Sequence, residues 1–533
     1  MTAKNRSRKN EYPLKLVIVH YHLRPSGVRR IIELATPHLV RQLGGATPSV
    51  TLVSGEAPDA RWRAEFAEHL AGVPVECCVI PGCAYLSEQR RSPSAIALEL
   101  RSAFSRLLAG CRAGNCLVWA HNLGLGRNPV LARQLEQACA AGGIPLLAHH
   151  HDWWFDNRWP RWNEMKRAGW PTLKAAAHNV FLAGTNVFHL AINQADARIL
   201  RRHFGARAAW LPNLTEPAPR PSPVRVRAAR AWLREQLGAE GPVWLMPCRL
   251  LRRKNVAEAL LLTRWLRPAA WLVTTGGVSS ADEMAYAKKL AAAARQHGWP
   301  LRLGVLQRNE TGQPSVAELL AASEAVLLTS LQEGFGLPYL EAAAARRPLI
   351  ARLLANVAPD LAQFGFRFPQ GYQEILIDPR LFDWNAEQRR QQKLFSAWRA
   401  QLPGACRAWA AQPALLAGGK RPHPAPFSRL TLTAQLEVLV QPPEHSWALC
   451  GPWNPFLAVW RRRAAAGGLQ PTPWPRRAAR WLSGKVYAQR LQKVVRARPA
   501  SPARHAAVAA QVEFIRERLA ASNLFALLWN RET

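Results

Sequence analysis

The 533-residue sequence has no apolar run of about 18 residues, the length that a membrane-spanning helix needs. Its first residues are basic and lead into a short apolar run, which lacks the length and cleavage site of a signal peptide and predicts a first strand. The nine cysteines are irregularly spaced, and no Cys-x-x-Cys pair occurs. We therefore expect reduced thiols in a cytoplasmic protein, rather than a disulfide framework or a cysteine zinc site.

Acidic residues are also scarce. Asp and Glu number 35 against 71 Lys and Arg, so the formal net charge is +36. Because 49% of the residues are hydrophobic and only 20% are charged, a disordered acidic or polar chain is excluded. The excess positive charge predicts attraction to anions (nucleotides, nucleic acid or acidic membrane surfaces) without choosing among them.

Short apolar runs alternate with helical stretches in two series. The first comprises 14–20, 50–54, 75–80, 116–120, 145–148 and 180–183, and the second comprises 243–247, 270–275, 301–306, 325–329 and 348–351. Continuous apolar strands between helices predict parallel sheets covered on both faces. The fold class expected is therefore α/β, with two Rossmann-like, doubly wound domains over 11–215 and 228–400 that face a cleft. The proline-rich segment 216–227 is expected to link them.

The composition changes in residues 401–533. Prolines, arginines and tryptophans accumulate between 401 and 500, where Glu437 and Glu444 are the only acidic residues. We expect a basic, irregular or helical appendage that ends in a closing helix over 507–529. Its charged side chains are either simply exposed to solvent, or its arginines and tryptophans form a surface that binds an anionic membrane.

The segment 331–341, LQEGFGLPYLE, carries the strongest chemical signal. It follows a buried strand and opens a helix, so its glycines allow a ligand to approach the backbone and the helix start offers N–H groups to phosphate. Glu333 in the loop and Glu341 on the helix could each accept hydrogen bonds from sugar hydroxyls. The alternative is a simple loop-to-helix cap, with Glu341 favoured by the helix dipole.

A second signal lies about 80 residues earlier. Arg249 and Lys254 come directly after the strand 243–247, at its carboxyl end. Two cations there would neutralise a nucleotide diphosphate and stabilise it as a leaving group. Because Arg252 and Arg253 are also present, a solvated basic loop is the alternative reading.

Together these motifs resemble the retaining, nucleotide-sugar-dependent glycosyltransferases of the GT-B type, family 4-like (glycosyl transferases group 1). The family's Glu–seven residues–Glu element matches Glu333 to Glu341, and its phosphate-binding Arg and Lys match Arg249 and Lys254. The resemblance extends through 347–351 and back to 211–214, and covers roughly residues 14 to 365.

The resemblance implies roles for residues of the second domain. Arg249 and Lys254 would clamp the donor diphosphate, Glu341 would bind the ribose hydroxyls, and Glu333 would face the donor sugar. The backbone at Gly336 and Leu337 would hold the transferred sugar or a phosphate.

In the first domain, 26–28 is similar to the family's Gly-Gly-Val loop, with Gly27 approaching the diphosphate and Ser26 in place of the first glycine. Another departure is Arg346, where the family usually has a small residue or glycine after the helix. If that position is left-handed, the arginine is strained by about 1 kcal/mol.

Histidines follow two strands of the first domain, as His121 and as the run 149–151 before Asp152. His151 resembles the family position that contacts a sugar, and Asp152 and His121 are further candidates. Neighbours in an extended segment point to opposite faces, so the run is not expected to bind a metal ion. Trp153 and its neighbours Trp154 and Trp159 could stack on a sugar ring or simply pack in the core.

The resemblance implies transfer of a sugar from a nucleoside-diphosphate sugar to an acceptor with retention at the anomeric carbon. No Asp-x-Asp string occurs, so no metal and no other cofactor are expected at the diphosphate. The expected acceptor is a carbohydrate or a lipid-linked molecule of envelope polysaccharide or glycoconjugate synthesis, and no nucleic acid partner is expected. The location expected is cytoplasmic, peripheral on the inner face of the membrane.

Alternatives remain at this stage. The chain could be a basic protein that binds nucleic acid or membrane without catalysis. It could also be another two-Rossmann sugar-nucleotide enzyme, such as an epimerase or a phosphorylase, or a catalytically silent relative.

Overall fold

The structure, a computed structural model, describes residues 14–43, 48–215, 217, 219–278, 280–307, 312–419, 421–497 and 500–529. Parts of the expected domains, linker and appendage (11–13, 216, 218 and 530–533 among them) lie outside these residues. The chain divides into two compact units. The first comprises 1–216 and 479–518, and the second comprises 217–478 and 519–533.

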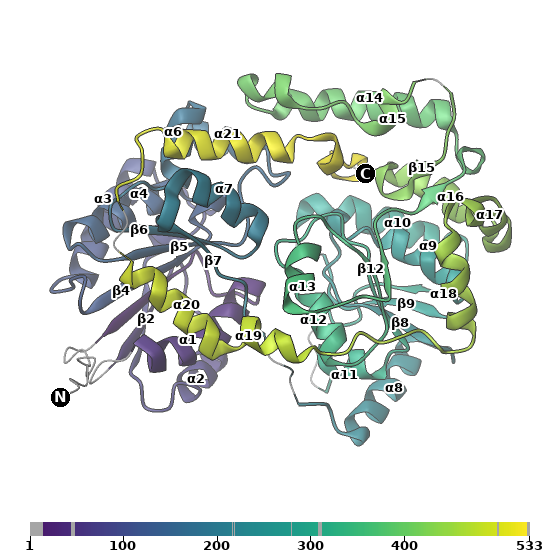
Figure 1. Ribbon diagram of the computed structural model, residues 1–533, viewed down its shortest axis with the longest axis horizontal. Helices are drawn as coiled ribbons and strands as arrows, with labels where there is room; N and C mark the ends of the chain where they lie inside the picture. Colours follow the sequence, from purple (N-terminus) through teal and green to yellow (C-terminus); the bar gives the residue numbers. More distant parts are fainter. Residues whose placement is uncertain are drawn as a thin grey trace, which may run out of the picture. The chain divides into compact units, whose positions relative to one another are not determined.

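The first unit contains a parallel sheet of seven strands in the order β3-β2-β1-β4-β5-β6-β7. Its strands are β1 (Lys15–Val19), β2 (Ser49–Ser54), β3 (Val75–Val79), β4 (Cys116–His121), β5 (Leu146–His150), β6 (Val187–Ala191) and β7 (Ala208–Trp210). Its helices are α1 (Gly27–Leu43), α2 (Ala60–Glu68), α3 (Pro93–Leu107), α4 (Pro129–Ala141), α5 (Arg161–Arg167), α6 (Leu173–Val180), α7 (Gln194–Phe204), α19 (Ala479–Leu482), α20 (Gly484–Arg496) and α21 (Ala506–Arg518) (Figure 1).

Alternate residues of β1 enter different cores. Val17 and Val19 pack with α3 and α4 on one face of the sheet, whereas Leu16 and Ile18 pack with α1, α2 and α20 on the other. Both faces are therefore buried, which explains the continuous apolar runs of these strands.

The second unit contains a parallel sheet of six strands in the order β10-β9-β8-β11-β12-β13. Its strands are β8 (Val243–Met246), β9 (Trp271–Thr274), β10 (Leu301–Arg302), β11 (Ala325–Leu328), β12 (Leu349–Arg352) and β13 (Gln370–Tyr372), and a separate antiparallel pair is formed by β14 (Leu376–Ile377) and β15 (Ala425–Pro426). Its helices are α8 (Pro223–Leu237), α9 (Val256–Leu266), α10 (Met284–Gln296), α11 (Val316–Ala322), α12 (Leu337–Ala344), α13 (Ala358–Phe364), α14 (Trp384–Gln401), α15 (Ala414–Ala417), α16 (Leu432–Val440), α17 (Pro443–Cys450) and α18 (Pro455–Ala465) (Figure 1).

Two doubly wound α/β sheets confirm the expected fold class. The expected linker 216–227 differs from the structure, because α8 begins inside it. Pro223 stands at the start of this helix, where a proline costs no hydrogen bond, and the Ser222 side chain accepts from Arg225 N at 3.4 Å.

Residues 401–533 do not form one appendage, because they divide between both units. Leu439 of α16 and Leu457 of α18 belong to the core of the second unit, together with Phe525 near the C-terminus. Helix α20 packs on α1 in the first unit, and α21 packs on α6 and α7 of the same unit. Local composition could not show which unit each of these helices packs against, since an amphipathic helix does not specify which surface it covers.

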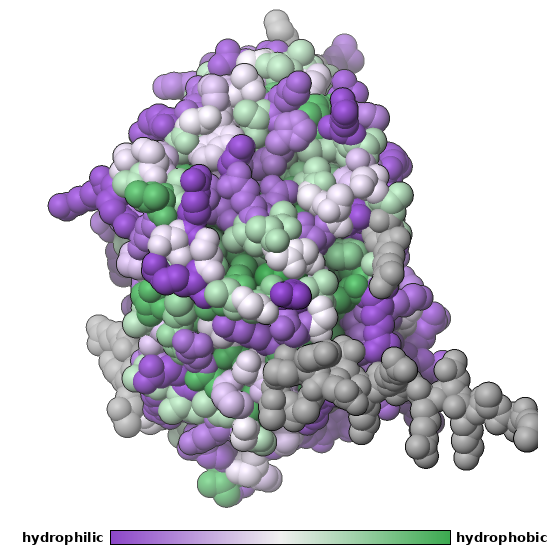
Figure 2. All heavy atoms as spheres, turned by 90° about the vertical axis from the view of Figure 1, so that its left-hand side faces the viewer, coloured by the Kyte–Doolittle hydropathy of each residue, from purple (hydrophilic) through white to green (hydrophobic). Residues whose placement is uncertain are grey.

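One face of the molecule presents a mixture of polar and apolar residues (Figure 2). Figure 2 shows one face of the molecule, where hydrophilic residues predominate and hydrophobic residues form smaller groups between them. Among the helices that the structure describes, none is both long enough and apolar enough to cross a membrane.

Helix α12 is followed by a left-handed residue at Arg346, so the condition for strain at this position is met. Arg346 has φ 53°, and its N–H donates to Ala343 O at 3.1 Å. Arg347 N–H donates to Ala342 O at 3.0 Å. This pair of bonds is a Schellman motif, in which glycine is the favoured residue at the left-handed position.

We expect Arg346→Gly to raise the free energy of unfolding by about 1 kcal/mol, because glycine adopts this conformation without a Cβ clash. Denaturant-induced unfolding would measure the change. Arg346→Ala keeps the clash and is the matched control, so an equal gain in both variants would contradict the strain argument.

Helix α20 should be essential to the first unit. Leu491 is fully buried in its core, so Leu491→Ala is expected to lower the free energy of unfolding by about 3 kcal/mol. Leu98→Ala, at a leucine that is 69% exposed, should change it by less than about 0.5 kcal/mol. Thermal unfolding of both variants tests this, and equal melting temperatures would show that α20 does not contribute to this core.

Candidate functional site

Two turns of the second unit meet at the carboxyl ends of neighbouring strands. The turn Arg252–Lys254 comes after β8, and the loop of residues 329–336 comes after β11, which pairs with β8. The Thr329 hydroxyl donates to Lys254 O and Asn255 O, each at 3.0 Å, and Leu331 N donates to Arg253 O at 2.7 Å. These bonds fix the loop that carries Glu333 against the turn that carries Lys254.

The Glu333 carboxylate lies between two cations. Lys254 Nζ donates to Glu333 Oε1, and Arg253 Nη1 contacts Glu333 Oε2 at 3.2 Å. The side chains of Lys254 and Glu333 are only 8% and 9% exposed, so little water screens the contact. Two of the predicted site residues, Lys254 and Glu333, are thus adjacent in the structure.

The environment keeps Glu333 ionised. Burial alone would raise the pKa of its carboxyl, but the charges of Lys254 and Arg253 outweigh burial and lower the pKa to about 2. Glu333 therefore has no proton to donate near neutral pH. Two cations and one anion leave one positive charge in the cluster, which favours an anionic ligand.

The other predicted side chains of this unit lie on the segments that precede the turn and follow the loop. Arg249 follows β8 and is exposed, and its Cγ would be 3.1 Å from a Cβ added at Gly276. Glu341 is an exposed residue of α12.

The start of α12 is shaped by its first residues. Gly336 has φ 82°, and a Cβ there would lie 2.6 Å from the Tyr339 ring, so the turn requires glycine. Pro338 has no N–H, and Tyr339 N donates to Gly336 O at 3.0 Å. Among these described residues, Leu337 therefore provides the first-turn amide that could meet a ligand.

Two contacts of Glu333 were not singled out from the sequence. Arg253 was read only as part of a basic loop, although it lies next to Lys254 and reaches the same carboxylate. Asn356 Nδ2 donates to Glu333 O at 2.8 Å from the segment before α13, and no pattern in the sequence marks it.

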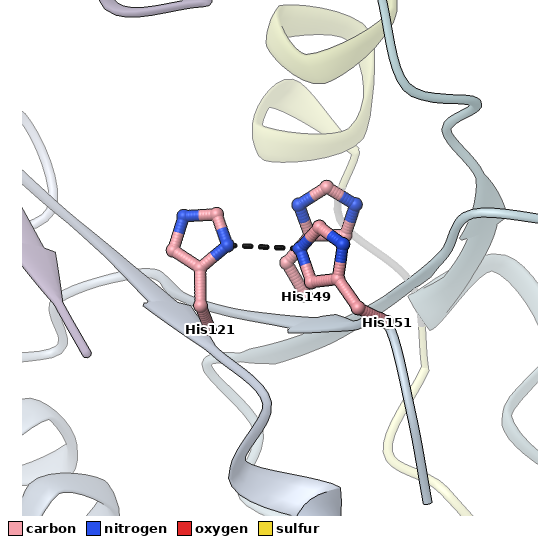
Figure 3. Close-up of side chains that lie close together, drawn as sticks. All are labelled: His121, His149 and His151. Carbon is pink, nitrogen blue, oxygen red and sulfur yellow. Dashed lines mark hydrogen bonds between the residues drawn. The ribbon is translucent and has the colours of Figure 1, made fainter. Parts of the chain in front are cut away.

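In the first unit, three histidines converge: His121 ends β4, His149 lies in β5 and His151 follows β5 (Figure 3). His121 Nδ1 and His151 Nε2 share a hydrogen bond at 3.0 Å, and the His149 ring lies beside both. His150 points to the other face of the sheet, where its Nε2 is 3.0 Å from His189 Nδ1. The expected alternation is therefore observed, but His149 and His151 share one face and the neighbouring strand supplies His121.

Burial makes these imidazoles poor bases. It lowers the pKa of His121 and His149 well below the usual value and that of His151 to about 4, and like charges on neighbouring histidines add to the effect at His121 and His149. All three rings are therefore neutral near pH 7. Asn122, in a left-handed conformation, holds the segment by accepting from His151 N at 2.7 Å and Asp152 N at 3.2 Å.

The remaining candidates of the first unit differ in exposure. Asp152 is partly exposed and pairs with Arg158 at 3.2 Å. Trp153 is 1% exposed, stacks on His150 at 4.3 Å and donates to Asp196 Oδ2 at 2.8 Å, which fits the packing interpretation. Gly27 begins α1, and a Cβ there would meet nothing within 4 Å.

Known proteins share features with this chain. A mannosylglucosyl-3-phosphoglycerate synthase of Petrotoga mobilis is 23% identical over 347 residues, which are 64% of this chain and 65% of that protein. The chain thus spans just under two thirds of this relative. Anabaena Alr3699/HepE, solved with UDP-glucose, is 15% identical with a TM-score of 0.49, covering 90% of this chain and 99% of that one. A trehalose 6-phosphate synthase from Burkholderia multivorans is 14% identical with a TM-score of 0.45, covering 91% and 98%.

The match to a protein family falls on the second unit. Residues 233–379 match the family described as glycosyl transferases group 1. This range contains Arg249, Lys254, Glu333 and Glu341, the residues on which the predicted resemblance rests. The expected similarity to glycosyl transferases group 1 is therefore confirmed for this part of the chain.

Proposed function

We propose that this protein is a glycosyltransferase that transfers a sugar from a nucleoside-diphosphate sugar to an acceptor, with retention at the anomeric carbon. The observation that carries the proposal is the buried contact of Glu333 with Lys254 and Arg253, inside the segment that matches the family. A nucleic-acid-binding protein would have no need for a buried carboxylate within its basic cluster.

The donor diphosphate is proposed to bind at the cationic cluster. Lys254 and Arg253 leave one positive charge after pairing with Glu333, and the exposed Arg249 follows the same strand. Fixed cations stabilise the charge that develops on a departing diphosphate, so these side chains would act there without a metal ion or another cofactor. The Leu337 amide and the exposed Glu341 would hold the sugar or phosphate and the ribose hydroxyls.

The reaction is proposed to occur on one face of the donor sugar. The bond from the anomeric carbon to the phosphate oxygen breaks, the acceptor oxygen bonds to the same carbon, and the acceptor proton moves to the departing phosphate. Glu333, held ionised, would orient sugar hydroxyls and stabilise positive charge at the ring, but it would not form a covalent intermediate.

The acceptor is proposed to be a carbohydrate or a lipid-linked molecule. His151, His121 and Asp152 are proposed as the residues of the first unit that contact sugar. The net charge of +36 and the exposed Trp453 and Val459 of the segment 443–465 support peripheral binding to an anionic membrane surface.

Binding of the donor should stabilise the protein. At a hundredfold excess over the dissociation constant, a ligand that binds only the folded state adds about 2.7 kcal/mol to the free energy of unfolding. A thermal-shift screen of nucleoside-diphosphate sugars is expected to show such a shift for at least one of them. RNA binding that weakens with salt, without any shift from these donors, would contradict the proposal and favour a nucleic-acid-binding protein.

Substitutions at the cluster should separate binding from transfer. Glu333→Gln removes the negative charge, so we expect nucleoside diphosphate to bind at least as tightly while transfer falls about 100-fold or more. Lys254→Met should weaken nucleoside diphosphate binding at least about tenfold, because a buried cation is lost. Calorimetry and product analysis with a labelled donor measure the two effects.

The exposed Lys288 provides the matched control, since Lys288→Met removes a cation of the same unit outside the cluster. It should leave binding and transfer unchanged. Unchanged transfer in Glu333→Gln, or products of epimerisation or phosphorolysis in the native protein, would refute the proposed reaction.

A further inference from the structure

The histidine cluster of the first unit has the dimensions of a metal site. One nitrogen from each of His121, His149 and His151 can be chosen so that all lie within 4.8 Å of one another. The ring centres are 5.3 Å apart for His121 and His151, 5.4 Å for His121 and His149, and 4.4 Å for His149 and His151. A tetrahedral zinc ion with Zn–N distances of about 2.0–2.1 Å holds its ligand nitrogens about 3.4 Å apart, so shifts of about 1 Å or less would complete the site.

We propose that His121, His149 and His151 bind one divalent transition-metal ion of the zinc class, leaving one coordination position open. This site goes beyond the proposed glycosyl transfer, whose diphosphate cluster lies in the other unit, although it shares His121 and His151 with the proposed sugar contacts. It rests on the convergence of three side chains from two adjacent strands, β4 and β5, and the residue that follows β5 (Figure 3).

The hydrogen bonds of the cluster leave lone pairs for an ion. His121 and His151 share one proton between Nδ1 and Nε2, and the buried His121 Nε2 has no hydrogen-bond partner among the described residues. Binding would move that proton to a ring nitrogen outside the site and free both facing nitrogens. His149 Nδ1 accepts the Trp119 indole N–H at 3.3 Å, and the buried His149 Nε2 has no hydrogen-bond partner among the described residues.

The ligand type selects the ion. Three imidazoles favour zinc, cobalt, nickel or copper, whereas magnesium, calcium and manganese prefer oxygen ligands. Burial keeps the rings neutral, as ligation requires. The nearest acidic side chain in sequence, Asp152, pairs with Arg158 at 3.2 Å.

A metal ion could reach the three histidines from the side of His151. His121 and His149 are fully buried, but His151 is partly exposed. An ion could therefore enter past His151, and its fourth position would take water or an oxygen ligand, as in zinc sites with three protein ligands.

The test uses the full-length protein without a polyhistidine tag, stripped with a chelator and titrated with Co²⁺ and Zn²⁺. We expect one ion per chain by calorimetry, visible Co²⁺ absorption typical of tetrahedral nitrogen ligation, and no binding of Mg²⁺ under the same conditions. His121→Phe and His151→Phe keep a ring but remove the ligand, so each should weaken Zn²⁺ binding at least about tenfold.

His150→Phe is the matched control, because His150 is buried on the same strand but faces His189 on the opposite side of the sheet. It should bind Zn²⁺ as the native protein does, with circular dichroism confirming that each variant is folded. If the Phe variants fail to fold, His151→Ala at the partly exposed position replaces them. Absence of stoichiometric Co²⁺ and Zn²⁺ binding, or binding that survives loss of His121 and His151, would overturn the proposal.

Discussion

A carboxylate in a protein interior needs compensating positive charge, and the second unit is arranged around that need at Glu333. Lys254 and Arg253 can reach it only because the turn after β8 and the loop after β11 leave the sheet side by side. The Thr329 hydroxyl bonds to the backbone of that turn and fixes the two segments together. The charge balance at this point therefore depends on the strand order, and the ligand-binding chemistry depends on the charge balance.

The same property of parallel sheets produces the histidine cluster in the first unit. Adjacent parallel strands end at the same edge, so His121 meets His149 and His151 although the residues are far apart in sequence. The two clusters differ in kind. One is a charged group in which two cations outnumber one anion, whereas the other is a neutral group of nitrogen lone pairs that is largely buried at a sheet edge.

The sequence was sufficient for most strands and for placing Lys254 and Glu333 directly after two of them, because apolar runs and the position of residues after a strand are local signals. The expected strand 180–183 was wrong, since Val180 ends α6 and β6 lies at 187–191. The sequence was insufficient where tertiary contacts determine which side chains come together. Alternation correctly separated His150 from its neighbours, but it could not show that another strand supplies His121 as a third nitrogen. Trp153 could equally have been a surface ring, and only its neighbours place it in the core.

The return of α20 and α21 to the first unit bears on how the protein is made. Tyr487 and Leu491 fill a core built otherwise from residues before 216, and Phe514 stacks on residues of the same unit, including Phe181. On the ribosome, the residues before 216 would emerge with these apolar surfaces exposed to solvent. The surfaces would be covered only after α20 and α21 had been synthesised. A nascent chain of this design would depend on chaperones during that interval.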